Sequence, residues 1–114
     1  MKILNLTQNT LVADQVKIAS TPFSRMVGLL NRSSLGSREA LIIDHCQSIH
    51  MFFMRFAIDV IFVDRNCQVV GLVVGIKPYR LSPIFFKASY AIELKEGAIQ
   101  ESKTQIGDHL QLAE

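Results

Sequence analysis

Short segments rich in β-branched and aromatic residues recur along the chain, and they constrain its fold more than any other feature of the sequence. Residues 58–63 and 69–74 carry apolar side chains on both faces, which is typical of central strands. Residues 90–94 alternate between larger side chains and Ala91 or Glu93, which predicts a half-buried strand. The segments with strand-like composition are residues 2–6, 10–13, 15–19, 41–44, 48–54, 58–63, 68–74, 89–94 and 109–112.

One clear helix signal interrupts these segments. Thr21 can cap a helix, and Pro22 suits the first helical position, where its missing N–H costs nothing. The apolar stripe that follows has the spacing of one helix face and consists of Phe23, Met26, Val27 and Leu30. A second, short helix is predicted around residues 98–104. We therefore expect a single mainly β (α+β) domain over residues 1–114, a compact β-sandwich or barrel-like fold with an N-terminal helix around 22–31.

Residues 48–54 and 58–64 are expected to pair as a hairpin through the turn at residues 55–57. Extending that register brings Cys46 close to Cys67. Free thiols are the favoured interpretation, because buried cysteines of a reducing compartment usually stay unpaired. A disulfide between the two cysteines is the alternative.

Composition narrows the classes of function. The 114 residues suit one domain, and 49% apolar residues suffice for a core without a disulfide framework or a metal. A net charge of +2 with scattered Lys and Arg does not indicate a nucleic-acid partner. No apolar run approaches the ~20 residues that span a bilayer, and residues 1–7 lack the apolar core of a signal peptide. We expect a cytoplasmic location and no cofactor.

Five segments, taken in order, carry a resemblance to a known family. They are residues 19–32, 39–43, 53–64, 91–97 and 106–108. With them the chain resembles the domain-of-unknown-function family 192, also called uncharacterised protein family 0127, over about residues 15–113. The resemblance implies a β-rich fold of sandwich type and no known reaction, and it offers a scaffold in a pilus or secretion-related envelope assembly as an alternative role. The chain departs from the family at residues 55–57 and 66–67, so a ligand shared by the family need not bind here.

Two sets of residues suggest site chemistry. His45, Cys46 and His50 suggest a metal site, but Cys46 and His50 lie four strand steps apart, about 13 Å, whereas zinc ligands bond at about 2.0–2.3 Å. We therefore expect no metal. His50 and Asp59 form a candidate catalytic pair, because a carboxylate can orient an imidazole for general acid–base work. A structural role for Asp59, capping backbone N–H groups or pairing with Arg55, is the favoured interpretation.

Basic residues in two predicted loops form the leading candidate for a binding site. If the loops meet at one end of the sheet, they form a cationic mouth lined by aromatic rings, Phe56 among them. Arg suits bidentate recognition of carboxylate or phosphate, and Pro78 and Pro83 stiffen the second loop. The expected ligand-binding residues are Arg55, Asp59, Lys77, Arg80, Phe53 and Tyr79. Solvated loop charges without a ligand are the alternative.

The apolar run Ile84, Phe85 and Phe86 follows Pro83 in a predicted loop. Exposed, it would mark a contact with a protein partner; folded inward, it would add a short strand. The sequence as a whole favours a small non-enzymatic binding or accessory module for a small anionic ligand or a peptide carboxylate. The alternatives are a hydrolase or isomerase that uses His50 and Asp59, and an envelope scaffold that contacts its partners through Ile84–Phe86.

Overall fold

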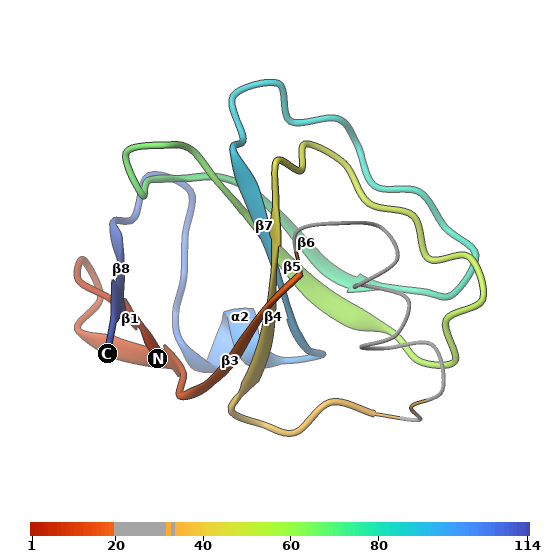
Figure 1. The fold of residues 1–114 in the computed structure, drawn as a ribbon, viewed down its shortest axis with the longest axis horizontal. Coiled ribbons are helices and arrows are strands. Elements are labelled where there is room, and N and C mark those ends of the chain that lie inside the picture. Colours follow the sequence, from red (N-terminus) through yellow and green to blue (C-terminus); the bar gives the residue numbers. More distant parts are fainter. Residues whose placement is uncertain (20–31, 33) are drawn as a thin grey trace.

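The structure is a computed structural model that describes residues 1–19, 32 and 34–114 (Figure 1). The helix predicted around residues 22–31 lies outside the described residues. The elements that are described form two β-sheets and one short helix, which gives the mainly β, sandwich-like fold expected from the sequence. Within the same residues, no helix is long and apolar enough to cross a membrane.

Eight strands and one helix are described. Their bounds are β1 Lys2–Asn5, β2 Thr10–Ala13, β3 Gln15–Ala19, β4 Glu39–Asp44, β5 Ile58–Val63, β6 Val69–Ile76, β7 Tyr90–Lys95, α2 Ala98–Glu101 and β8 Leu110–Ala113. The smaller sheet has the order β2-β1-β8, with antiparallel pairs. The larger sheet has the order β3-β4-β7-β5-β6, in which β3 and β4 run parallel and the other pairs antiparallel. Every strand expected from composition is confirmed to within two residues, except residues 48–54.

The larger sheet buries side chains on both of its faces. Alternate residues of β5 enter two hydrophobic cores: Ile58, Val60 and Phe62 belong to the first core, and Ile61 and Val63 belong to the second. Since all of β5 is buried, the prediction of a central strand there is confirmed.

Strands β6 and β7 exchange the positions expected for them. β7 lies between β4 and β5, and even Glu93 on it is fully buried, so the prediction of a half-buried strand is wrong. β6 is one of the two edge strands, so the prediction of a central position for Val69–Val74 is wrong. Its apolar residues still contact core on both sides, Val70 and Val73 in the first core and Leu72 in the second. The apolar composition of β6 therefore indicates that both of its faces are covered by core residues. It does not indicate that β6 has a neighbouring strand on each side.

Residues 48–54 do not pair with β5, because β6 and β7 already occupy both of its edges. They run instead beside residues 79–85, and we call residues 47–56 and 77–85 together the ribbon. The amide of Met51 donates to the Arg80 carbonyl at 2.9 Å, and the amide of Tyr79 donates to the Met51 carbonyl at 2.7 Å. The strand-like composition has a different cause: Ile49, Met51 and Met54 are buried in the first core.

The two cysteines form no disulfide. The sulfur of Cys46 lies 3.2 Å from the carbonyl of Ser48, and the sulfur of Cys67 lies 3.8 Å from the Tyr90 hydroxyl. The expected approach of the two thiols rested on the hairpin between residues 48–54 and 58–64, which is absent from the sheet.

Asp59 joins three elements from the middle of β5. Its side chain is fully buried, on the side of the sheet that carries Ile61 and the second core. One carboxylate oxygen accepts the amide of Gly75 at 2.9 Å, where β6 bulges with φ +62°. The other accepts the amides of Gly97 at 3.1 Å and Ile99 at 3.0 Å, at the start of α2. A buried carboxylate is tolerated here because three N–H donors replace its water.

Asp59→Asn is expected to lower the free energy of unfolding by about 2 kcal/mol. The amide cannot accept on both sides, so at least one buried N–H group loses its charged acceptor. Urea unfolding followed by circular dichroism measures the loss. A change within about 0.5 kcal/mol would contradict the anchoring role, because surface substitutions commonly fall in that range.

Candidate functional site

The candidate site is built from two turns of the ribbon that leave neighbouring strands. Ile58 at the start of β5 pairs with Ile76 at the end of β6, so the chain before β5 and the chain after β6 lie side by side. The amide of Met54 donates to the carbonyl of Met51 at 3.3 Å and closes the first turn. The amide of Arg80 donates to the carbonyl of Lys77, also at 3.3 Å, and closes the second turn. The two loops thus lie together at one end of the sheet (Figure 1), which is the arrangement that the cationic mouth requires.

Each turn places an aromatic residue where glycine is favoured. Phe53 has φ 65° and Tyr79 has φ 64°, and each is the third residue of its turn. The left-handed conformation costs a residue with a side chain about 1–2 kcal/mol. Both rings nevertheless point outward, 68% and 61% exposed, and meet edge to face with centroids 6.1 Å apart. The turns therefore present a strained, paired aromatic tip to solvent.

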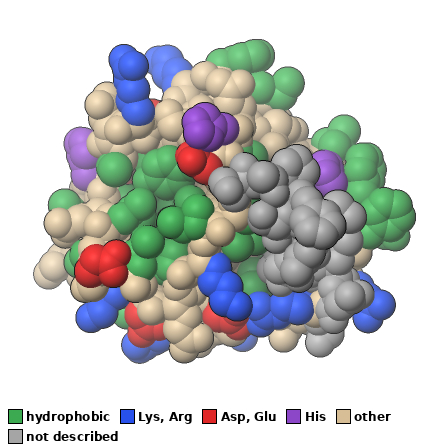
Figure 2. Space-filling model, viewed as in Figure 1, with side chains coloured by type: hydrophobic (Ala, Val, Ile, Leu, Met, Phe, Trp, Pro, Cys, Tyr) green, Lys and Arg blue, Asp and Glu red, His purple; other side chains and the backbone are tan. Residues whose placement is uncertain are grey.

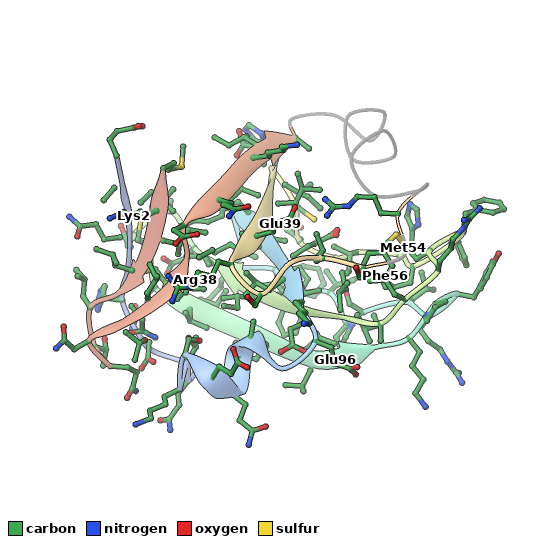
Figure 3. All side chains as sticks on the ribbon, turned by 90° about the horizontal axis from the view of Figure 1, so that it is seen from below. Lys2, Arg38, Glu39, Met54, Phe56 and Glu96 are labelled. Atoms are coloured by element: carbon green, nitrogen blue, oxygen red, sulfur yellow. The ribbon has the colours of Figure 1, made fainter. Side chains whose placement is uncertain are left out.

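Three cations lie on the same two segments as this tip, Arg55 two residues after Phe53, and Lys77 and Arg80 on either side of Tyr79 in the chain. Arg55, Lys77 and Arg80 are all exposed, and among the described residues no carboxylate forms an ion pair with any of them. Phe56 is half-buried and packs against the first core, next to Met54 in Figure 3. The ribbon therefore carries the basic and aromatic residues that the sequence assigns to the mouth.

Asp59 does not belong to this group. Its carboxylate is buried on the second-core side, occupied by the backbone of β6 and α2. Asp59 does cap backbone N–H groups, as in the structural interpretation, but its partners are not Arg55 or the turn at residues 55–57.

His50 lies on the ribbon, stacked on Phe52 with ring centroids 5.2 Å apart, and its neighbours Ile49 and Met51 enter the first core. The two members of the candidate catalytic pair therefore lie on opposite sides of the sheet.

The His45 region offers a polar cavity in place of a metal cluster. His45 is solvent-exposed, and its Nδ1 lies 3.3 Å from a carboxylate oxygen of Asp44. Within the described residues, no three His, Cys, Asp or Glu side chains converge as a metal-binding group. A cavity of about 410 Å³ is lined by Asp44, His45, Gln47, Ala88 and Ser89. Sequence reasoning missed it, because Ser89 joins the others only through the pairing of β4 with β7.

The run Ile84–Phe86 divides between core and surface. Phe85 packs on Phe62 with ring centroids 4.5 Å apart and covers Gly71, where an added Cβ would lie 2.4 Å from the Phe85 ring. Ile84 and Phe86 stay exposed, at 56% and 78%. The expectation of a partner contact therefore rests on these two side chains.

Two carboxylates away from the ribbon have lowered pKa values with structural causes. Arg32 donates two hydrogen bonds to Glu39, at 2.7 and 2.8 Å, and these lower the pKa of Glu39 to about 2. Burial opposes ionisation of Asp108, but hydrogen bonds from Asn5, the Gln105 amide and Gln8 outweigh it and keep its pKa below the usual value. These carboxylates hold loops in place, and sequence reasoning did not single out either as an ion-pair or hydrogen-bond centre.

Comparisons with known proteins agree with this fold. The DUF192 family model, described as "Uncharacterized ACR", matches residues 3–112. A UPF0127 protein of Thermococcus sibiricus is 35% identical over 112 residues, covering 95% of this chain and 72% of the relative. A UPF0127 protein of Pyrococcus furiosus is 34% identical over 115 residues and covers 96% of each chain. The crystal structure of a protein of unknown function from Novosphingobium aromaticivorans has a TM-score of 0.82 at 19% identity, over 98% of this chain and 84% of that one.

Glu39→Gln is expected to weaken the fold by about 1 kcal/mol at neutral pH, and the difference should vanish on acidification. The folded pKa of about 2 lies below the ordinary value of 4.5, so the carboxylate stabilises the fold above pH 4.5 and loses this contribution as the pH falls towards 2. Urea unfolding at several pH values tests this, with the exposed Glu114→Gln as control. A difference that stays constant between pH 7 and pH 2 would contradict it.

Tyr79→Gly is expected to leave the free energy of unfolding unchanged or to raise it by about 1 kcal/mol, because glycine relieves the left-handed strain. Phe85→Ala is the matched control, since it removes a packed ring and should cost about 3 kcal/mol. Thermal unfolding compares the two variants. A loss above about 1 kcal/mol in Tyr79→Gly would show that the exposed ring stabilises the fold.

Proposed function

We propose that this chain, which belongs to the DUF192 family of uncharacterised proteins, is a non-enzymatic binding module whose two ribbon turns hold an anionic group beside apolar surface. The group is a carboxylate or a phosphate. Arg55, Lys77 and Arg80 contact the charge, and Phe53 and Tyr79 contact the apolar part next to it.

The observation that carries the proposal is the pair of exposed aromatic rings in left-handed backbone positions. A solvent-facing ring gains little from burial, and this backbone conformation opposes it, so the fold alone does not account for Phe53 or Tyr79. Strained positions that the surrounding structure holds in place cluster at ligand sites. The ladder between Met51 and residues 79–80 supplies the holding structure.

The charges around the rings indicate the sign of the ligand. Guanidinium groups bind planar oxyanions through two parallel hydrogen bonds, and a lysine adds a mobile point charge. Arg55 and Arg80 come from different turns, so a group held between them would be clamped from both sides. The alternative of a hydrolase or isomerase that uses His50 and Asp59 together loses its support, because these two residues lie on opposite sides of the larger sheet.

Soluble anions should perturb the two turns and nothing else. Titration of isotope-labelled protein with acetate, glycerol phosphate and short acidic peptides is expected to shift the amide resonances of residues 50–55 and 77–81 saturably. Arg55→Ala and Arg80→Ala should each weaken binding about tenfold, roughly 1.4 kcal/mol, by loss of a charged hydrogen bond.

Lys2→Ala is the matched control, because Lys2 is an exposed cation on β1 (Figure 3) and should leave binding unchanged. Parent and arginine variants that respond alike, or shifts confined to other residues, would overturn the assigned site.

A further inference from the structure

We infer that the anionic group is presented by the surface of an anionic lipid bilayer, on which the two ribbon turns dock; this inference rests on the proposed function. The ribbon turns would dip their aromatic tips between the headgroups, and the cations beside them would contact lipid phosphates and carboxylates.

The apolar tip of the ribbon is larger than the ring pair alone. Phe52 is 43% exposed and Leu81 is 66% exposed, next to Phe53 and Tyr79 on the same two segments. Figure 2 shows hydrophobic side chains gathered at the end of the molecule where the ribbon lies in Figure 1. Exposed contiguous apolar surface of this kind marks an interaction site. Phe, Tyr and Leu are also side chains that gain from the boundary between headgroups and acyl chains, where amphipathic anchors insert.

The charged side chains of the ribbon are all positive. Residues 45–58 and 65–92 contain no Asp or Glu, whereas Arg55, Lys77 and Arg80 are exposed within two residues of Phe53 or Tyr79 in the chain. Cations beside an inserting apolar tip attract it to anionic lipids, by roughly fivefold in affinity for each basic residue near the surface. Three such residues therefore supply a second signal in addition to apolar insertion, and stable membrane anchoring commonly needs two.

The shape of the site favours a surface over a small molecule or an extended peptide. Ligand pockets enclose their ligand, and peptide-binding domains offer a groove or a sheet edge. The turns instead project at one end of the molecule. Neither of the two described cavities is lined by a residue of the two turns: one lies near Asp44 and Ser89 and touches the ribbon only at Gln47, and one of about 390 Å³ is lined by residues of β2, α2 and the turn at Ser37 and Arg38.

The geometry also fixes the orientation of docking. The ribbon end of the larger sheet would face the lipid, and the smaller sheet, with Lys2 on β1, would face the solvent (Figure 3). The main chain of the turns is held by Met51 and Tyr79, so the tip would insert without unfolding a strand.

Sedimentation with vesicles tests the inference. The full chain is expected to bind vesicles of phosphatidylcholine mixed with phosphatidylglycerol, to release at high salt, and to leave pure phosphatidylcholine vesicles largely unbound. The double variants Phe53→Ser/Tyr79→Ser and Arg55→Ala/Arg80→Ala should each weaken binding at least tenfold. Lys2→Ala and Ile106→Ser, an exposed cation and a 66% exposed apolar residue outside the ribbon, should leave it unchanged.

A spectroscopic arm reports insertion directly. The chain contains no tryptophan, so Tyr79→Trp places a single reporter at the tip. Its emission should shift to the blue with anionic vesicles and be quenched by brominated lipid. An unchanged spectrum together with no sedimentation overturns the inference.

The outcomes separate the two proposals. If soluble acidic peptides shift the ribbon amides while anionic vesicles do not bind, the bilayer inference fails and the proposed function stands, with a protein as the partner. If vesicles bind equally with or without anionic lipid, the anion-holding role fails as well.

Discussion

The carboxylate of Asp59 is the contact on which the rest of the structure depends. It places a negative charge inside the second core and surrounds it with backbone N–H groups from β6 and α2. The same contact sets the bulge at Gly75, one residue before β6 ends at Ile76. The second ribbon turn begins directly after that residue, so the position of Lys77, Tyr79 and Arg80 follows from a hydrogen bond made on the other side of the sheet.

The positions of the strands could be predicted from the sequence wherever the composition of a segment reflects the burial of its own side chains. The strands β1 to β8 and the start of α2 could all be located, because alternation and β-branched residues reflect covered faces. Pairing is a different property. Residues 48–54 look like a strand because Ile49, Met51 and Met54 are buried, but the two edges of β5 belong to β6 and β7. The hydrogen-bond partners of a strand depend on segments far away in the chain, which local composition does not encode.

The candidate site shows the same division. The meeting of the basic loops entered the sequence argument only as a condition, and it is met because Ile58 at the start of β5 pairs with Ile76 at the end of β6. The exclusion of Asp59 could not be predicted, because its donors at Gly97 and Ile99 lie about forty residues further along the chain. Residues that carry the family resemblance, such as Arg32, Glu39, Asp59 and Asp108, mostly hold backbone and loops in place. The resemblance therefore indicates the fold more directly than it indicates a ligand.

The pairing of β1 with β8 has a consequence for how this domain can be joined to others. Lys2 lies opposite Ala113, so the chain enters and leaves the fold at neighbouring points of one small sheet (Figure 1). A domain closed in this way can be inserted into a loop of a host protein as a cassette, because the host needs to bridge only the spacing between two adjacent strands. The ribbon would remain accessible in such a fusion, and joining the two ends directly would allow new termini to be opened elsewhere.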